Sequence, residues 1–478
     1  MKNNNLKKNL IYQVSYEILV ILLPLVLSPY VSRVIGAEGL GVYDFTNSVA
    51  QYFVLFSMLG IKIYGNRMIA QCRDNQSTLN QTFSNLLSLH LLISITMSAA
   101  YIIFLLFVEK LRLYFGIMFL YVLSGLFDIS WFYFGIEEFK TSVFRNAISK
   151  ILNVVIIFCF VKSERDTWIY CLSMAGCILL SQVALWIPLK KHVKLIKPQR
   201  RIIITYLKPM LILFIPTIAV SLYTYMDKIM IGGMTDTKQV GLYSNAAQLM
   251  AVPTAIISAF GTVMLPKMSN LTANGEKKTA SNYFDTSIKY FMLISVGMAF
   301  GLSAISKVFV PIYWGEAFEQ CIQLVKCLSI AVPFMALANV VRTQYLIPKS
   351  MDHIYIGSVI CGAVVNMIVN LCLIRKYGAL GASIGTVCAE SSVCIYQLFF
   401  TRKTLKITKH FPIIVAYILI GALMFFSLVV INEYLPVKIW TIIIEVLLGG
   451  LIYGVFNIIL LYHNNDAIIC KYLKRSRK

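Results

Sequence analysis

The sequence of 478 residues has little charge: only 13% of its residues are Asp, Glu, Lys or Arg, whereas 58% are hydrophobic. A soluble globular protein carries about a quarter of its residues as charged side chains, so this composition excludes a soluble or a disordered chain. The mean hydropathy of +0.75 agrees with that exclusion. Long apolar runs take the place of the missing charge, and they predict an all-α polytopic membrane protein.

Metal, redox and ATP-binding motifs are also lacking. The cysteine pairs at 171/177, 321/327 and 388/394 are six residues apart, unlike the C-x-x-C spacing of zinc and redox sites. The sequence has no G-x-x-x-x-G-K-[ST] phosphate loop. We therefore predict no metal and no cofactor. The energy for any transport would come from a proton or sodium gradient, from a partner, or from the substrate's own concentration difference.

Apolar segments of about 20 residues recur along the whole chain, and each is long enough to cross a bilayer. We predict about fourteen transmembrane helices, near 10–34, 40–64, 81–108, 112–135, 142–161, 167–188, 203–231, 239–265, 283–309, 320–346, 352–373, 379–400, 411–431 and 438–462. The connections between them are too short to hold an extramembrane domain. This architecture favours a transporter over an enzyme.

The basic residues predict the orientation. The net charge is +22, from 43 Lys and Arg against 21 Asp and Glu, and the excess collects in the N-terminal residues 1–8, in the 189–202 and 401–410 connections and in the C-terminal tail. Because basic loops are retained in the cytoplasm, we expect both termini of a multi-pass protein of the cytoplasmic membrane to lie inside. The charge thus reflects topology, and we expect no nucleic-acid partner. The polar, basic start without a cleavage site predicts a retained first helix.

The connections also predict the domain organisation. The longest linker, 189–202, is basic and contains Lys197-Pro198, and a second boundary lies near 401–410. We expect an N-terminal six-helix lobe over 1–196, a second six-helix lobe over 197–405, and two additional helices with a basic cytoplasmic tail over 406–478.

A short internal repeat supports two related lobes. Leu40-Gly-Val-Tyr43 opens the second helix of the first lobe, and Val240-Gly-Leu-Tyr243 opens the second helix of the second lobe. Each follows a helix that contains proline, at Pro24 and Pro216, and a short turn. The match is short enough to arise by chance. If it is real, the two lobes are parallel repeats.

Several charged residues fall within the predicted helices, where a charge costs about 3 kcal/mol or more and marks an interior or a cavity. Arg33, Asp44 and Lys228 would cluster near the outer ends of the equivalent helix pairs, as a gate that holds a phosphate or as a static ion pair. Arg145 is expected to line a cavity. For Lys62, Lys289 and Arg342, snorkelling to the interface is an equal alternative.

Three carboxylates in or near apolar runs are candidates for ion coupling: Glu17, Asp128 and Glu390. A structural hydrogen bond or a protonated bystander is the alternative for each. The aromatic stretch Trp131–Phe134 also fits a belt at the membrane interface.

Three stretches resemble a known family: Ser32–Tyr43, Trp131–Glu137 with the following Arg145-Asn146, and Asn366–Glu390 with Lys376–Ser383 inside it. Together they are similar to bacterial polysaccharide repeat-unit flippases for O-antigen or capsule, of the multidrug/oligosaccharidyl-lipid/polysaccharide exporter superfamily. The resemblance implies two lobes in a V around a cationic cavity. It also implies alternating access that moves a polyprenyl-pyrophosphate-linked oligosaccharide from the inner to the outer leaflet.

By the same resemblance, Arg33, Asp44, Arg145 and Lys228 are expected to contact the substrate headgroup. The last two helices would form a groove for the lipid tail, as in the related peptidoglycan-precursor flippases. That function is one alternative, and a multidrug or cation antiporter, which would prefer an acidic cavity, is another. An enzyme such as a membrane polysaccharide polymerase or glycosyltransferase would carry a large extracytoplasmic loop or an acidic catalytic pair at the surface, and the sequence shows neither. We expect membrane lipids and the polysaccharide polymerase machinery as partners, and a monomer.

Overall fold

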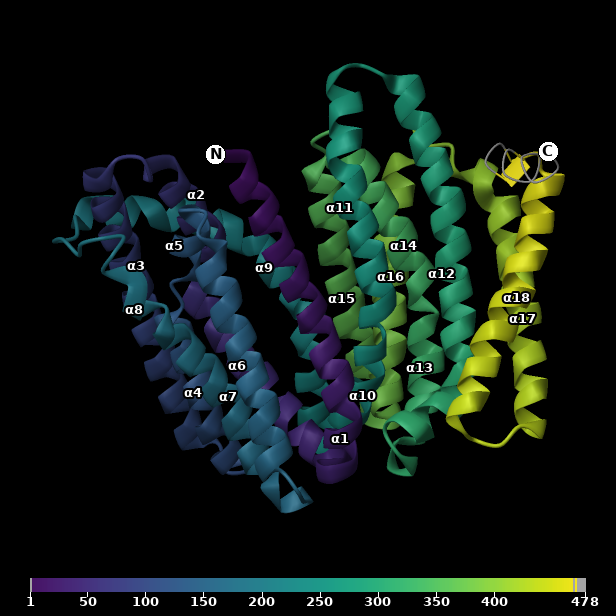
Figure 1. Ribbon diagram of the computed structural model, residues 1–478, viewed down its shortest axis with the longest axis horizontal. Coiled ribbons are helices and arrows are strands. Elements are labelled where there is room, and N and C mark those ends of the chain that lie inside the picture. Colours follow the sequence, from purple (N-terminus) through teal and green to yellow (C-terminus); the bar gives the residue numbers. More distant parts are fainter. Residues whose placement is uncertain (1, 467–468, 471–478) are drawn as a thin grey trace. The chain divides into compact units, whose positions relative to one another are not determined.

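The computed structural model describes residues 2–466 and 469–470, and within them it leaves undescribed the side chains of 2–22, 139–142, 200, 216, 219 and 223. Every regular element in this part of the chain is helical (Figure 1). A bilayer offers no water to unpaired N–H and C=O groups, so a helix, which pairs them internally, is the natural spanning element. The expected all-α class is confirmed.

The chain divides into two compact units, residues 1–241 and 242–478. The helices of the first unit are α1 (Lys2–Met58), α2 (Ile61–Cys72), α3 (Gln76–Phe107), α4 (Arg112–Phe127), α5 (Ser130–Gly135), α6 (Phe139–Phe160), η1 (Glu164–Asp166), α7 (Thr167–Ala184), α8 (Trp186–Leu189) and α9 (Arg200–Met234). Helix α10 (Thr237–Leu249) begins in the first unit and ends in the second.

The second unit continues with α11 (Ala251–Ala273), α12 (Lys277–Tyr313), η2 (Glu316–Phe318), α13 (Cys321–Ser329), α14 (Ala331–Val341), η3 (Arg342–Leu346), α15 (Asp352–Tyr377), α16 (Ala379–Thr401), η4 (Ile407–His410), α17 (Phe411–Tyr434) and α18 (Ile439–His463). The contact-based boundary differs from the linker-based one because α9 is grouped with the first unit. The division into 1–196, 197–405 and 406–478, which concerns lobes that move, stays a prediction.

Twelve helices in the described residues are long and apolar enough to cross a membrane. A thirteenth is added if Arg201–Ile215 and Val220–Met234, bent by 52° to each other, form one span. The predicted helix at 10–34 lies in the first arm of α1, and the predicted helix at 40–64 covers the second arm and the start of α2. The two arms of α1 join at Gly36, with φ 68° and ψ −178°. Glycine adopts this positive φ without steric cost, so a break at one residue replaces the predicted turn. Separate passes for the two arms would give the expected fourteen.

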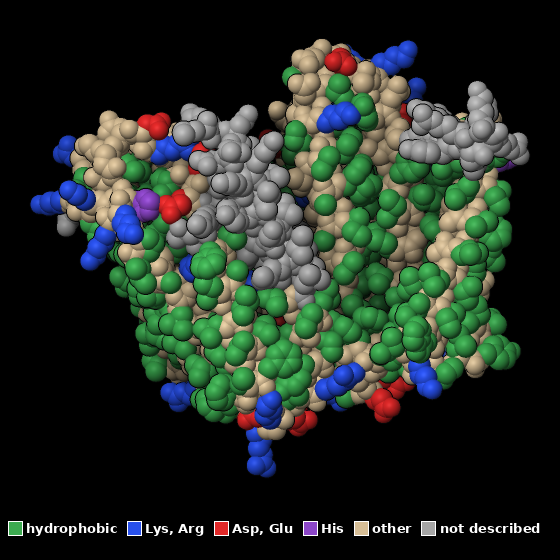
Figure 2. Space-filling view, in the orientation of Figure 1, with side chains coloured by type: hydrophobic (Ala, Val, Ile, Leu, Met, Phe, Trp, Pro, Cys, Tyr) green, Lys and Arg blue, Asp and Glu red, His purple; other side chains and the backbone are tan. Residues whose placement is uncertain are grey.

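Large apolar side chains are exposed on the described surface, with Phe107, Ile187 and Trp440 between 73% and 81% exposed. Figure 2 shows hydrophobic side chains over the flanks of the visible face, while most visible Lys, Arg, Asp and Glu side chains lie near helix ends. Apolar exposure on this scale does not suit water, but it matches the hydrocarbon core of a bilayer. The protein is a multi-pass membrane protein.

The core of the first unit contains the aromatic stretch that the sequence also allowed as an interfacial belt. Trp131, Phe132 and Tyr133 are fully buried, and the rings of Trp131 and Phe132 pack against Phe83. The Tyr133 hydroxyl donates a hydrogen bond of 2.6 Å to the Leu185 carbonyl. The belt interpretation is therefore wrong, because these side chains hold α5 against α3 and α7.

Candidate functional site

The second arm of α1 and helix α9 carry an ion pair between two of the predicted headgroup residues. The Lys228 Nζ donates to Asp44 Oδ1 at 2.7 Å, and the two side chains are only 23% and 16% exposed. Low exposure shields the pair from water and strengthens the attraction between its charges. The expected proximity of Asp44 and Lys228 is confirmed, although 184 residues separate them in sequence.

Two repeat glycines allow α1 to approach α10, the helix that follows the Lys228-bearing α9. A Cβ atom on Gly41 would lie 1.6 Å from the backbone carbonyl oxygen of Thr237, and one on Gly241 would lie 1.9 Å from that of Ala37. Real Cβ atoms essentially never come within 3.0 Å of another heavy atom. The glycines of the sequence repeat therefore meet at a backbone-to-backbone crossing of α1 and α10.

Arg33 lies on the first arm of α1, three residues before the Gly36 break, and its side chain is exposed. Asp44 lies on the second arm of the same helix. The fold thus places Arg33 and Asp44 on opposite sides of one glycine hinge. Whether both contact one ligand stays a prediction.

Arg145 lies on α6 in the wall of a cavity of about 550 Å³ between α6 and α7. Its Nη1 donates to the Ser181 carbonyl and to Gln182 Oε1, both at 2.8 Å, and its Nη2 donates to Asn146 Oδ1 at 2.8 Å. Glu138 also lines this cavity. Arg145 therefore lines a cavity, and the hydrogen bonds fix the orientation of its planar guanidinium. That this cavity receives the substrate headgroup stays a prediction.

The three carboxylates predicted for ion coupling have different surroundings. Asp128 is buried, accepts a hydrogen bond of 3.0 Å from the backbone N–H of Ser130, and lies 3.3 Å from the Lys62 Nζ. Glu390 lies on α16, where Arg342 is the charged residue that acts on it electrostatically. Glu17 lies in α1, and its side chain is outside the described part of the structure.

Ion pairs near helix ends were not predicted. Asp285 on α12 accepts hydrogen bonds from Lys409 and His410. Asp466 accepts hydrogen bonds from Lys289 and from the Tyr290 hydroxyl. The signal in the sequence is a cation near the end of a long apolar run, but a single sequence does not identify the partner, 177 residues away for Lys289.

The Asp466 carboxyl lies just beyond α18, outside the membrane-spanning segments. Burial alone would raise the pKa of Asp466, but the hydrogen bonds from Lys289 and Tyr290 outweigh it and hold that pKa below its usual range. Lys289 is therefore paired, whereas the sequence left open whether it snorkels freely to the interface. This contact ties the chain after α18 to α12.

Among the residues that the structure describes, no group of three or more His, Cys, Asp and Glu side chains is arranged to hold a metal ion. The polar features of the first unit are instead cations held in defined positions, Arg145 by hydrogen bonds and Lys228 by Asp44. Such groups bind anions, and a guanidinium matches two phosphate oxygens at once.

Comparison with known proteins gives matches over most of the chain. Residues 6–272, more than half of the chain, match a family model described as Polysaccharide biosynthesis protein. A protein of Shigella dysenteriae assigned as an O-antigen transporter is 22% identical over 402 residues, which cover 83% of this chain and 99% of the relative. A protein of Escherichia coli (strain K12) with the same assignment is 23% identical over 416 residues, 84% of this chain and 97% of the relative.

A solved structure has a similar fold. The lipid II flippase MurJ in an inward closed conformation superposes with a TM-score of 0.77 at 16% identity, over 96% of this chain and all of that chain. At this identity the likeness shows the shared fold alone and does not identify a substrate.

Proposed function

Because the chain belongs to the family of polysaccharide biosynthesis proteins, we propose that it flips a polyprenyl-pyrophosphate-linked oligosaccharide repeat unit from the inner to the outer leaflet of the cytoplasmic membrane. The unit would serve synthesis of a capsule, an O-antigen or an exopolysaccharide. The protein acts as a transporter and makes or breaks no covalent bond. The relatives assigned as O-antigen transporters support this function.

The observation that carries the proposal is the oriented guanidinium of Arg145 at the wall of the α6–α7 cavity. A pyrophosphate offers several oxygens to such a planar donor. Arg33 and Lys228 supply further positive charge in the same unit. Lys228 is paired with Asp44, so a phosphate would have to compete with that carboxylate, and this competition would couple headgroup binding to a change at the α1–α9 contact.

Energy coupling is the second element of the proposal. Asp128 is occupied by Lys62 and by the Ser130 N–H, which favours a structural role for it. Glu390 is the better candidate to carry a proton or to bind sodium, because a carboxylate within a membrane helix is costly to retain without use. Glu17 keeps the same predicted role.

The topology and partners complete the proposal. Both termini lie in the cytoplasm, and the protein works as a monomer in which two lobes alternate in access. Membrane lipids surround it, and the polysaccharide polymerase machinery receives its product. The basic loops support this orientation.

Leaflet-resolved measurement of lipid-linked oligosaccharide tests the proposal. Cells that lack the protein are complemented with the wild type, Arg33→Ala, Arg145→Ala or the control Arg165→Ala, all at matched expression. Arg165 is exposed in the connection before α7. We expect substrate to build up on the cytoplasmic leaflet without the protein. The wild type and Arg165→Ala should clear it. Arg145→Ala should slow clearance at least tenfold, because a tenfold change corresponds to the loss of about one hydrogen bond to a charged group.

Three outcomes contradict the proposal. An unchanged leaflet distribution after deletion excludes this flippase function and favours the antiporter, to be tested by drug export. Build-up of a peptidoglycan lipid precursor in place of an oligosaccharide lipid favours the alternative flippase. Full clearance by Arg145→Ala excludes the assigned role of its guanidinium.

A further inference from the structure

The second unit contains an apolar cavity of about 850 Å³. Its described lining includes residues of α17 but none of α18, so it differs from the groove between these two helices that is expected to hold the substrate's lipid tail. Its walls come from α12, α14, α16 and α17, with side chains such as Val296, Phe334, Leu337 and Leu398. Pockets of about 300–1,000 Å³ bind molecules of drug size. The cavity is therefore large enough for part of a lipid.

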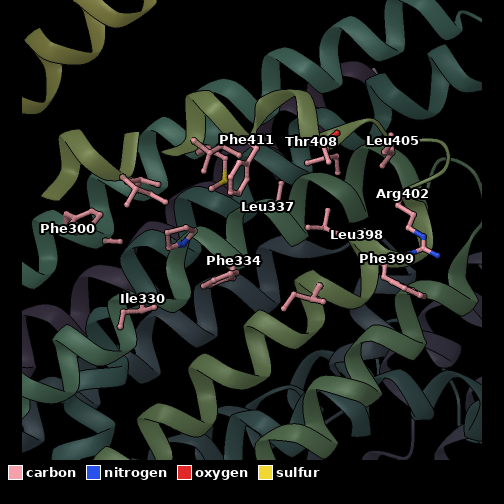
Figure 3. A pocket seen from close by; sticks show the side chains of 18 of the residues that line it. Phe300, Ile330, Phe334, Leu337, Leu398, Phe399, Arg402, Leu405, Thr408 and Phe411 are labelled. Carbon is pink, nitrogen blue, oxygen red and sulfur yellow. The ribbon is translucent and has the colours of Figure 1, made fainter. Parts of the chain in front are cut away.

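One end of the cavity is positively charged. Arg402 and Lys406, from the connection between α16 and α17, line it together with Thr408. Figure 3 shows Arg402 beside Phe399 at one end, with Phe300 and Ile330 at the other. The ligand that fits this distribution has a long apolar part and an anionic head.

The two cations are available for an anion. The neighbouring Lys409 pairs with Asp285, whereas no ion pair of Arg402 or Lys406 occurs within the described residues. The Arg402 guanidinium lies 4.2 Å from the centre of the Phe399 ring, which holds it at the cavity end through a cation–π contact. Stacking leaves the N–H edge of a guanidinium free to bind phosphate oxygens.

We propose that this cavity is a binding site for an anionic phospholipid, with an acyl chain between α12, α14 and α17 and the phosphate between Arg402 and Lys406. The connection that carries both cations is predicted to be cytoplasmic, and the cytoplasmic leaflet is where anionic phospholipids attract basic residues. The substrate's pyrophosphate has separate candidate contacts, since Arg33, Asp44, Arg145 and Lys228 all lie in residues 1–241. The bound lipid would fill the space between α17 and the helices it packs against.

Competition in detergent solution tests this site on the purified full chain. Native mass spectrometry measures retention of phosphatidylglycerol against phosphatidylethanolamine with identical acyl chains. Each well-placed cation near a lipid surface changes affinity about fivefold, so we expect the double variant Arg402→Ala/Lys406→Ala to lose about thirtyfold in preference for phosphatidylglycerol. The matched control Lys403→Ala/Lys278→Ala removes two exposed cations that do not line the cavity and should keep the wild-type preference.

A second pair of variants probes the acyl-chain part. Leu398→Trp places a larger ring inside the cavity, and Leu371→Trp places the same ring on an exposed, non-lining position of α15. Leu398→Trp should reduce retention of both lipids at least fivefold, and Leu371→Trp should not.

The proposal is overturned if wild-type protein shows no preference for phosphatidylglycerol, or if the control double variant loses as much as Arg402→Ala/Lys406→Ala. It is also overturned if equimolar polyprenyl phosphate displaces phosphatidylglycerol, because the cavity would then belong to the transport substrate. None of these results bears on leaflet clearance of the oligosaccharide, so failure here and failure of the proposed function are distinguishable.

Discussion

Asp44 and Lys228 are compatible with two roles, a permanent ion pair and a contact that opens for a phosphate. An exposed pair contributes about 0–1 kcal/mol, and removing one partner of a fully buried pair costs about 3–5 kcal/mol. These side chains are 16% and 23% exposed, so their energies fall between those limits. Stability alone does not separate the two roles, but stability and transport measured together do.

We predict that Asp44→Asn and Lys228→Gln each lower the free energy of unfolding by about 2 kcal/mol, because each leaves one charge without its partner. The double variant Asp44→Asn/Lys228→Gln removes both charges and should recover most of that loss. Transport should nevertheless stay at least tenfold below wild type in the double variant, because the cation for the headgroup is gone. Thermal unfolding in detergent and leaflet clearance in cells measure the two quantities.

The same double variant provides the contradicting outcome. If it recovers transport together with stability, the pair is a static contact and Lys228 does not bind substrate. The conservative Lys228→Arg supplies the control, since it keeps the charge and should retain more transport than Lys228→Gln.

At the residue scale, the sequence predicted one charge contact but not the partners of the other charged side chains. The repeat placed Asp44 and Lys228 near each other, and the structure pairs them. It did not predict that Lys62 would pair with Asp128, or that Ser181 and Gln182 would hold Arg145. Partners from different helices depend on helix rotation and packing, which a single sequence does not contain.

At the scale of helices, the crossing of α1 and α10 depends on glycine at both contact positions. We predict that Gly41→Ala and Gly241→Ala each destabilise the protein by about 3 kcal/mol, the upper end for overpacking. The added methyl would meet a backbone carbonyl, which cannot turn aside as a side chain can. The fraction of protein that elutes as a monodisperse species after mild heating, followed by thermal unfolding, measures the effect.

Gly233→Ala is the matched control, because a Cβ at Gly233 on α9 would meet no heavy atom within 4 Å. It should leave stability unchanged or raise it slightly, since alanine favours a helix over glycine by about 1 kcal/mol. Wild-type stability of Gly41→Ala would show that the two helices do not cross at this contact.

Helices themselves were the most predictable elements, because a bilayer demands about 20 apolar residues per pass and the sequence displays such runs directly. Their breaks were less predictable. The sequence predicts a turn over 35–39, where the structure has a single left-handed glycine, Gly36. It also gives one helix over 203–231, where the structure bends by 52° between Ile215 and Val220. The hydropathy pattern contains little information about local backbone geometry, so it does not predict where a helix breaks or bends.

At the scale of the whole molecule, the transport cycle needs a source of energy, and the described carboxylates differ in their freedom to supply it. Asp128 is already neutralised by Lys62 and hydrogen-bonded to Ser130. A change of its protonation would cost stability in every conformation. Glu390 has no such close ion pair within the described residues, and Arg342 acts on it only electrostatically. Substitutions at Asp128 and Glu390 should therefore have different effects, on stability at Asp128 and on energy coupling at Glu390.

We predict that Glu390→Gln lowers the rate of oligosaccharide clearance at least tenfold and makes the residual rate independent of the membrane gradient. The neutral amide keeps the size of the side chain but neither releases a proton nor attracts sodium strongly. Asp128→Asn should instead lower stability by at most about 1 kcal/mol, because Lys62, which is 59% exposed, is solvated by water when it loses its partner, while the transport that remains keeps its gradient dependence. Clearance in inverted vesicles, with a protonophore or a sodium ionophore added separately, identifies the ion. A Glu390→Gln protein that still responds to either ionophore as the wild type does would remove Glu390 from coupling and leave Glu17 as the remaining candidate.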